Sequence, residues 1–255
     1  MKANMQTYRI AEVLVPMRKE PSHKSEMINE IIFGEPIKII EKNKDWLYVN
    51  CIEYEYFGFI PTITRLEEIS PNKDEKFYFL QKQSEKITIN NGEPINLVAG
   101  SRLYSNQINN DFFKPAKNQI TVDDIINAGM LYLNAPYRWG GRSGFGIDCS
   151  GFVQMAYMLN NLILPRDAYQ QATIGETISF VSESKIGDLA FFENENGDII
   201  HVGLILNNNE IIHSSGRVKI DILDHEGIFN KELKAYTHKL KTIKRINIDS
   251  LRRCC

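Results

Sequence analysis

Residues Ala135–Gly151 read APYRWGGRSGFGIDCSG, and this stretch decides how the rest of the chain is interpreted. Four glycines lie between residues 140 and 146, and Asp148 and Cys149 follow them. After these, apolar residues recur with the spacing of one helix face, at Phe152, Met155, Ala156 and Leu159. The stretch therefore predicts a glycine-rich loop that brings Cys149 to the first turn of a helix, with Asp148 as its N-cap.

A cysteine at this position has an electrostatic reason to be reactive. Unpaired backbone N–H groups and the helix dipole favour negative charge at a helix N-terminus. We therefore expect the thiol of Cys149 to ionise more readily than in solution, and a thiolate is a nucleophile. The alternative is that Cys149 is a small buried side chain that only begins a core helix.

Two histidines downstream favour the chemical interpretation. The segment Gly187–Leu206 predicts strand, turn and strand, and a third strand ends near His213. His201 and Gly203 share one face of their strand because alternate residues do. If Gly203 lies opposite His213, the two histidines are diagonal neighbours, roughly 7–8 Å apart at Cα, whereas a one-residue slip separates them. Each histidine alone is more simply structural, but together they suggest a base and its orienting partner.

Several motifs then carry a family resemblance. DCSGF, GDLAFF, HVG and IIHSSG resemble the NlpC-type cysteine peptidases, which are bacterial cell-wall hydrolases with a papain-like core; they span Asp148–Phe152, Gly187–Phe192, His201–Gly203 and Ile211–Gly216. Three further runs resemble its branch of γ-D-glutamyl-L-diamino acid endopeptidases, or dipeptidyl-peptidase VI: PYRWGG, LPRDAYQQA and IDILDHEGI, at Pro136–Gly141, Leu164–Ala172 and Ile220–Ile228.

The resemblance implies a catalytic set. Cys149 is the expected nucleophile, His201 the general base and His213 the residue that orients the His201 ring. Tyr137 matches the position that helps the Cys149 backbone N–H to stabilise the tetrahedral oxyanion. The alternative for Tyr137 is an aromatic residue that only packs in the glycine loop. No cofactor or metal is implied.

The resemblance also assigns substrate contacts near the nucleophile. Asp148 and Ser150 are expected to recognise the region of the D-Glu α-carboxylate. Because two carboxylates repel, Asp148 can do so only through its backbone or an intervening donor. Arg166 is a further candidate, with a structural ion pair to the adjacent Asp167 as the alternative.

A third group is expected to bind the substrate's free amino terminus. By position in the branch, its members are Asp167, Glu26 and Tyr56. Carboxylates that face an ammonium group are a means of requiring a free amine. A solvated side chain is the alternative for Glu26 and Tyr56. Ala168 stands where some members of the branch have serine, so one substrate hydrogen bond is expected to be missing.

Composition and charge exclude several other classes. The chain has 255 residues, 43% of them hydrophobic and 24% charged, with a formal net charge of −2. This balance predicts neither nucleic-acid nor anionic-membrane binding, and no run approaches the ~20 apolar residues of a membrane span. Glu12 interrupts the best apolar stretch near the N-terminus, so no secretory signal is visible and a cytoplasmic location is expected, or a periplasmic or secreted one if a signal was removed.

The four cysteines have neither zinc-site spacing nor disulfide-scaffold density. They are Cys51, Cys149, Cys254 and Cys255. We expect a reducing compartment.

The N-terminal part reads as short strands with turns. FGE, DW and YFGFIP, within Phe33–Pro61, resemble a bacterial SH3-like domain. The sequence therefore predicts three domains: an SH3-like domain at 1–69, a second, reduced one at 70–115, and a papain-like catalytic domain at 116–255. The expected fold class is α+β, in which a helix carrying the cysteine packs on an antiparallel sheet carrying both histidines, preceded by small all-β barrels. A helix is expected at Val122–Leu133, capped by Thr121.

The resemblance implies hydrolysis of the γ-D-Glu–diamino acid bond of murein peptides with a free N-terminal L-Ala, which releases L-Ala-γ-D-Glu. We expect a monomer that recycles cell-wall peptides. The third substrate residue, diaminopimelate or Lys, stays open. The alternatives are a general cell-wall endopeptidase, a non-catalytic wall-binding protein and a thiol acyltransferase.

Overall fold

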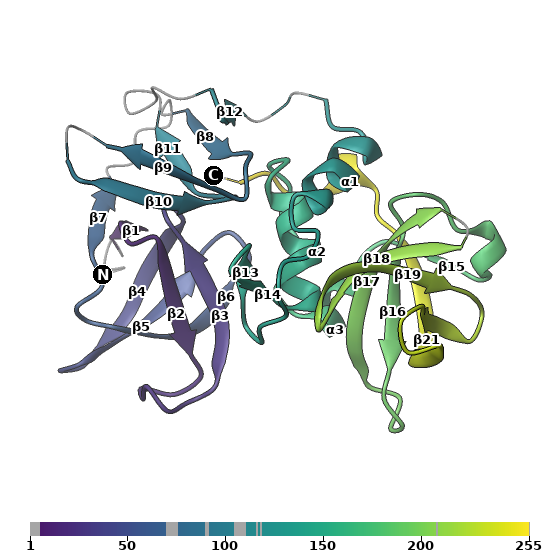
Figure 1. Ribbon diagram of the computed structural model, residues 1–255. Coiled ribbons are helices and arrows are strands. Elements are labelled where there is room, and N and C mark those ends of the chain that lie inside the picture. The colour runs from purple at the N-terminus through teal and green to yellow at the C-terminus, as the bar shows by residue number, and fades with distance from the viewer. Residues whose placement is uncertain are drawn as a thin grey trace. The chain divides into compact units, whose positions relative to one another are not determined.

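A computed structural model of the chain describes residues 6–69, 76–89, 92–104, 111–115, 117, 119–207 and 209–254. The chain forms two compact units (Figure 1). The N-terminal unit contains the described residues up to Pro115 together with the segment Trp139–Gly144. The C-terminal unit contains Lys117–Arg138 and Phe145–Cys254. The described chain is mostly β with few helices.

A seven-stranded antiparallel sheet begins the N-terminal unit, in the order β3-β2-β6-β5-β4-β1-β7. Buried and more exposed residues alternate along parts of β2 and β5, as expected for strands with one face toward a core. They are β1 (Thr7–Ile10), β2 (Leu14–Arg18), β3 (Met27–Ile32), β4 (Pro36–Lys42), β5 (Trp46–Cys51), β6 (Tyr56–Pro61) and β7 (Leu66–Ile69).

Five shorter strands form a two-stranded sheet, β10-β9, and a three-stranded sheet, β11-β8-β12. They are β8 (Phe77–Leu80), β9 (Ser84–Thr88), β10 (Pro94–Val98), β11 (Arg102–Tyr104) and β12 (Phe113–Pro115). Apolar residues of these strands share a core with Phe33, which directly follows β3 of the first sheet. They are Leu80, Ile87, Leu97, Leu103 and Phe113. The predicted domain boundary adjoins residues 70–75, which lie outside the described residues.

Buried charges connect parts of the N-terminal unit that are distant in sequence. The Arg102 guanidinium donates to both Glu53 oxygens, at 2.7 and 2.6 Å. Arg142, in β13 (Arg142–Ser143), donates to Glu35 Oε2 at 2.9 Å and to Tyr54 Oη at 3.0 Å. Both arginines are 0% exposed. Buried charges are tolerated when they are paired and hydrogen-bonded, so these pairs hold Arg142 within the unit.

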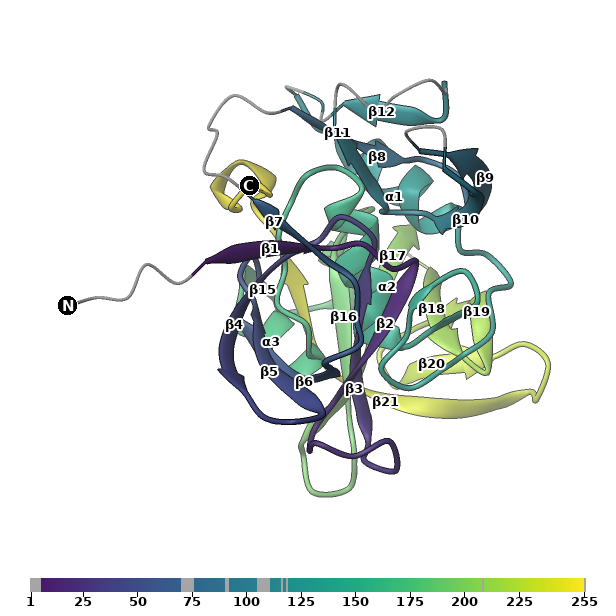
Figure 2. The same ribbon diagram turned by 90° about the vertical axis from the view of Figure 1, so that its left-hand side faces the viewer.

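The C-terminal unit closes six strands into a barrel, in the order β21-β16-β17-β18-β19-β20, because β20 also pairs with β21 (Figures 1 and 2). A further strand, β15, pairs with β21. The strands are β14 (Gly146–Ile147), β15 (Glu176–Ile178), β16 (Leu189–Glu193), β17 (Ile199–Asn207), β18 (Glu210–Ser215), β19 (Arg217–Leu223), β20 (Gly227–Asn230) and β21 (Ala235–Arg245).

The helices of this unit are short. They are α1 (Val122–Met130), α2 (Cys149–Met158), α3 (Ala168–Gln171) and the 3-10 turns η1 (Val181–Glu183) and η2 (Ile248–Ser250). The predicted Thr121 capping box is confirmed, but α1 ends at Met130, before the expected Leu133. None of the helices within the described residues is long and apolar enough to cross a membrane.

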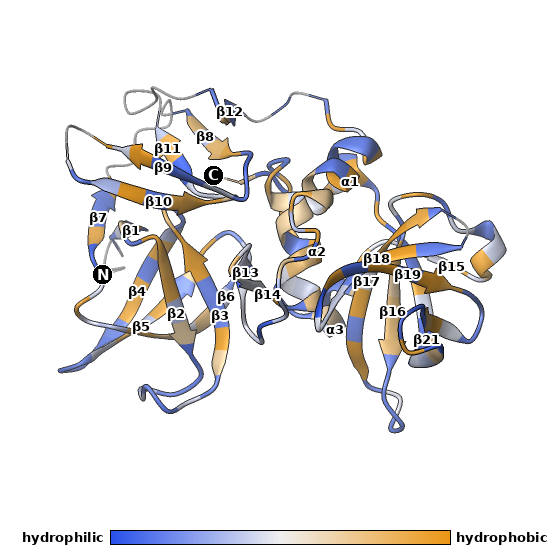
Figure 3. Ribbon diagram, in the orientation of Figure 1, coloured by the Kyte–Doolittle hydropathy of each residue, from blue (hydrophilic) through white to orange (hydrophobic). Residues whose placement is uncertain are grey.

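The barrel has an apolar interior, and hydrophobic and hydrophilic segments alternate along its strands (Figure 3). Phe192, Ile205, Ile211 and Leu223 belong to one buried cluster. Outside the barrel, α2 contacts β17 and β18, and α1 contacts α2. Every residue of α2 is buried. The helix lies between the barrel and α1, which explains why apolar residues are not confined to one of its faces.

The two histidine strands have the register that places both histidines on one face, the condition that the sequence left open. Gly203 of β17 pairs with His213 of β18. On the opposite edge of β17, His201 pairs with Phe192 of β16. A Cβ atom on Gly203 would lie 2.6 Å from Ile211 Cδ1 and 3.0 Å from His213 Cβ. Glycine is therefore required for the close approach of β17 and β18 at this point.

We expect Glu53→Gln to destabilise the N-terminal unit. The change removes the charge that neutralises the buried Arg102 guanidinium. Breaking a buried pair typically costs roughly 3–5 kcal/mol, and Glu35, 3.9 Å from Arg102, places the loss at the lower end. Urea unfolding followed by tryptophan fluorescence measures this unit, because Trp46 and Trp139, the two tryptophans of the chain, both belong to it.

Glu12→Gln is the matched control. Glu12 pairs with Arg65 at 2.9 Å on the surface of the same unit, where exposed pairs contribute little. Equal losses of stability in the two variants would contradict the assignment of the Glu53 pair as a stabilising buried contact.

Candidate active site

The first turn of α2 places Cys149 as the sequence predicted. Asp148 is the N-cap, and its Oδ1 accepts a hydrogen bond from the Gly151 N–H at 2.6 Å. This contact satisfies one of the free N–H groups at the helix start and fixes the first turn, in which Cys149 lies.

Asp148 also forms a buried ion pair. Arg166 donates to both of its oxygens, at 3.0 and 2.5 Å, and to Ser150 Oγ at 3.0 Å. All three side chains are at least nine-tenths buried. Arg166 therefore has Asp148 as a buried ion-pair partner. A role of Asp148, Ser150 and Arg166 in substrate binding stays a prediction.

The thiol of Cys149 lies beside the strand segment that carries His201. Its Sγ is 4.0 Å from the carbonyl oxygen of Ile200, the residue before His201. The backbone N–H of Val202, the residue after His201, hydrogen-bonds the sulfur. Burial, followed by the charge of Asp148, raises the pKa of Cys149 to about 12. Backbone N–H groups act in the opposite direction but are outweighed. The expectation of an easily ionised thiol is therefore wrong, because burial and the charge of Asp148 outweigh the backbone N–H groups near the sulfur.

The two histidines contact each other and a carboxylate. His201 Nε2 lies 2.9 Å from His213 Nδ1, and His213 Nε2 lies 3.2 Å from Asp221 Oδ2. The His201 and His213 rings are nearly perpendicular, at 89°. Asp221 also accepts from Asn230 Nδ2 and from the Lys231 backbone N–H, both at 3.1 Å. The groups form a continuous hydrogen-bonded row on the inner face of the barrel.

Neighbouring rings enclose His201. His238 stacks on it with centroids 4.1 Å apart, and Phe192 lies at 5.8 Å. Burial, with the charges of His238 and His213, lowers the pKa of His201 well below its usual value. Burial also lowers the pKa of His238, to about 4. Both rings are therefore neutral near neutral pH.

Sequence reasoning missed Asp221 and His238. Asp221 had a signal: the turn at Gly216 sets His213 opposite Lys219, and Asp221 follows two residues later on the same face. His238 had no local signal, because it reaches His201 from β21, far along the chain.

Tyr137 precedes the glycine-rich loop that leads to Cys149. Its backbone N–H donates to the Gly216 carbonyl at 2.9 Å. Burial, followed by the charges of Cys149 and Asp148, raises the pKa of its phenol. The hydroxyl therefore keeps its proton and can donate a hydrogen bond. Its role at an oxyanion stays a prediction.

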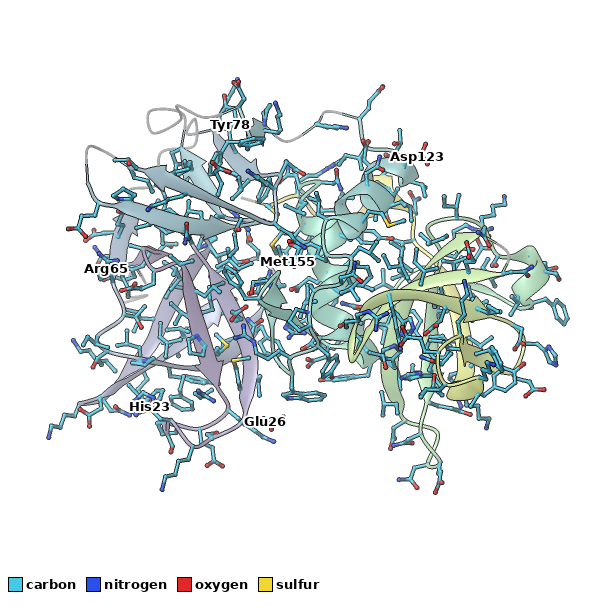
Figure 4. The ribbon with its side chains drawn as sticks, in the orientation of Figure 1. His23, Glu26, Arg65, Tyr78, Asp123 and Met155 are labelled. Atoms are coloured by element: carbon cyan, nitrogen blue, oxygen red, sulfur yellow. The ribbon has the colours of Figure 1, made fainter. Side chains whose placement is uncertain are left out.

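The residues predicted to bind the substrate amine lie in different units. Glu26 precedes β3 in the N-terminal unit and is labelled in Figure 4. Its Oε1 accepts from Trp139 Nε1 at 2.9 Å, and Lys19 lies 3.5 Å from Oε2. Tyr56 begins β6 in the same unit. Asp167 is the N-cap of α3 in the C-terminal unit. A shared amine site therefore stays a prediction.

No group of three or more His, Cys, Asp or Glu side chains within the described part of the chain is arranged to hold a metal ion.

Comparisons with known proteins identify the family. Residues 134–238, which hold the cysteine and both histidines, match the model of the NlpC/P60 family. The chain is 30% identical over 238 residues to the gamma-D-glutamyl-L-lysine dipeptidyl-peptidase of Bacillus subtilis, covering 81% of this chain and 79% of that protein. It belongs to the NlpC/P60 family. The chain is accordingly a cysteine peptidase.

Two further proteins are similar over most of their length. Dipeptidyl-peptidase 6 of Lysinibacillus sphaericus is 27% identical over 260 residues, covering 85% of this chain and 92% of that protein. The crystal structure of an NlpC/P60 family protein from Bacillus cereus superposes with a TM-score of 0.79 at 20% identity, covering 94% of this chain and 99% of that one. The latter similarity supports the fold of the papain-like peptidase domain.

We expect Arg166→Lys to impair this NlpC/P60 peptidase although the charge is kept. A lysine ammonium cannot bond both Asp148 oxygens and Ser150 Oγ as the planar guanidinium does. Because Asp148 holds the first turn of α2, Cys149 should lose its fixed position. Peptidase activity should fall at least tenfold, which is about 1.4 kcal/mol in transition-state stabilisation, and the melting temperature should fall.

Arg245→Lys is the control in the same unit. Arg245 donates to both oxygens of Asp188, at 2.9 and 2.8 Å, in a partly exposed pair. We expect its activity to change less than about twofold. If both variants lost activity equally, the Asp148 pair would have no specific role in placing the nucleophile.

Proposed function

We propose that the protein hydrolyses the γ-D-Glu–diamino acid bond of murein peptides that carry a free N-terminal L-Ala. The observation that carries the proposal is a thiol at the start of α2, beside the strand that holds His201, with His201 hydrogen-bonded to His213. The similar proteins support the substrate class. One is named gamma-D-glutamyl-L-lysine dipeptidyl-peptidase, and another is named dipeptidyl-peptidase 6.

In the first half-reaction, Cys149 attacks the γ-carbonyl carbon of D-Glu. The thiol proton moves to the free ring nitrogen of His201, because the raised pKa of Cys149 makes a base necessary. The new C–S bond leaves negative charge on the carbonyl oxygen. The Cys149 backbone N–H and the Tyr137 hydroxyl are the proposed donors to that oxygen.

Collapse of this intermediate breaks the C–N bond. His201 returns its proton to the leaving amine of the diamino acid, and a thioester remains on Cys149. In the second half-reaction, water gives a proton to His201 and attacks the thioester. The thiol then recovers its proton, and L-Ala-γ-D-Glu leaves with a free carboxylate.

We further propose that the N-terminal unit sets the specificity. Its strands are assigned to SH3-like domains at residues 1–69 and 70–115, before a papain-like domain at 116–255 in which α2 packs on the barrel. Glu26, Tyr56 and Asp167 are the proposed ammonium site. The contact between Glu26 and Lys19, 3.5 Å, is already of the carboxylate–ammonium type.

The proposed setting is the recycling of murein peptides in the cytoplasm. In intact wall, the L-Ala nitrogen is joined to the glycan by an amide bond and is neutral. An enzyme that requires a free amine on L-Ala would therefore act on peptides that have been released from the glycan.

Cys149→Ala should abolish hydrolysis of L-Ala-γ-D-Glu-diaminopimelate, because no other group on the enzyme supplies the nucleophile. Cys51→Ser and Cys254→Ser are the controls: both cysteines are free and buried, and both variants should stay active. Product analysis by mass spectrometry measures the effect. More than about a thousandth of wild-type activity in Cys149→Ala would exclude the covalent mechanism.

Acetylation of the substrate's L-Ala nitrogen should lower kcat/KM well over tenfold. It removes the charge that Glu26 is proposed to bind. Bound substrate would have to bury the Glu26 carboxylate, which is 41% exposed, and loss of one partner of a buried charge pair costs roughly 2–5 kcal/mol. Glu26→Gln should cause a similar loss on the free peptide. The two losses should not add, because both remove one interaction.

Glu20→Gln is the control: Glu20 lies in the same β2–β3 hairpin and is exposed like Glu26, but it is not part of the proposed ammonium site, so kcat/KM should stay unchanged on both peptides. Equal cleavage of free and acetylated peptide by the wild-type enzyme would reject the dipeptidyl-peptidase specificity and leave a general cell-wall endopeptidase.

A further inference from the structure

We propose that Asp221 is a positioning residue that, acting through His213, keeps the Nδ1 atom of His201 free to accept the thiol proton. The inference rests on the proposed roles of Cys149 and His201 as the reacting pair. It concerns a carboxylate that does not reach the reacting atoms and acts across two imidazole rings.

The first step is the ionisation state of Asp221. Its carboxylate is 2% exposed. Burial acts to raise its pKa, but the hydrogen bonds from His213 and the Lys231 N–H outweigh burial and lower it to about 2. The Lys219 ammonium, 3.6 Å from Oδ2, acts in the same direction. Asp221 is therefore ionised at neutral pH, and an ionised carboxylate only accepts hydrogen bonds.

The second step follows from this acceptor. His213 Nε2 lies 3.2 Å from Asp221 Oδ2, so Nε2 must carry a hydrogen. His213 is neutral because burial lowers its pKa, against the opposing effect of Asp221. A neutral imidazole carries one ring hydrogen. His213 Nδ1 therefore has a lone pair and accepts.

The third step transfers the same logic to His201. His201 Nε2 lies 2.9 Å from His213 Nδ1, so Nε2 of His201 must be the donor. His201 is neutral, as its lowered pKa indicates. Its single hydrogen is therefore on Nε2, and its Nδ1 has the lone pair that a general base needs.

The hydrogen bonds of the row all run in one direction, from His201 through His213 to Asp221. Asn230 Nδ2 donates to the same Asp221 oxygen, Oδ2, as His213, and the Lys231 N–H donates to Oδ1. The Asn230 Oδ1 is itself fixed by the N–H groups of Glu232 and Leu233. When His201 becomes an imidazolium, it still donates through Nε2. The charge of Asp221 then stabilises the cation through His213, and no proton needs to reach the carboxylate.

The tautomers can be measured directly in the wild-type enzyme. In protein labelled with 15N-histidine, long-range 1H–15N correlations distinguish protonated from unprotonated ring nitrogens, and single His→Gln variants assign the signals. We expect both His201 and His213 to carry their hydrogen on Nε2 near neutral pH. A hydrogen on Nδ1 of His213 would overturn the inference, whatever the substrate is.

Asp221→Asn tests the effect on the chemistry. It removes the charge but keeps the shape, and the buried residue does not touch the substrate. We expect kcat to fall at least tenfold with KM unchanged, and alkylation of Cys149 by iodoacetamide to slow in parallel. The control is Asp224→Asn, on the turn after β19, where the carboxylate accepts from the Glu226 N–H at 2.8 Å; neither rate should change.

Alkylation separates this inference from the proposed substrate. It needs the thiol and its base but no peptide. Slower alkylation in Asp221→Asn together with no hydrolysis of the tripeptide by wild type would support the role of Asp221 and reject the proposed function. Unchanged alkylation and kcat in a folded Asp221→Asn variant would overturn the role of Asp221. If that variant failed to fold, the wild-type tautomers would still decide.

Discussion

The geometry of the active site depends on one buried carboxylate, that of Asp148. It caps α2 through the Gly151 N–H and pairs with both terminal nitrogens of Arg166. These contacts fix where the helix begins and hence where Cys149 lies. The same negative charge, added to burial, raises the pKa of the thiol to about 12. In the proposed mechanism, Cys149 is therefore a firmly held thiol that does not ionise by itself, and the histidines have to remove its proton.

The barrel interior meets that requirement with a buried row of polar side chains. Elsewhere it is lined by apolar side chains such as Phe192, Ile205 and Leu223. A buried polar row is stable when every member is hydrogen-bonded, and His201, His213 and Asp221 satisfy one another in sequence. The apolar surroundings also keep both rings neutral in the resting protein. A neutral imidazole is a base, whereas an imidazolium is not.

Local patterns in the sequence predicted a large part of this site. The cap at Asp148 follows from residue type and helix spacing. Strand alternation put the two histidines on one face only if Gly203 pairs with His213, and this is the pairing observed. Features that depend on the folded environment were missed. Burial reverses the expected pKa shift of Cys149, and Arg166 reaches back to Asp148 across the fold. His238 stacks on His201 from β21, which no local spacing reveals.

The glycine-rich loop shows how the two units are linked along the chain. Tyr137 and Cys149 belong to the C-terminal unit, yet Trp139–Gly144 between them belongs to the N-terminal unit. Within that unit, the buried Arg142 side chain binds Glu35 and Tyr54. Glycines make the loop flexible, because they lose more conformational freedom on folding than other residues. The buried Arg142 guanidinium therefore restrains the glycine-rich segment that separates Tyr137 from Cys149 along the chain.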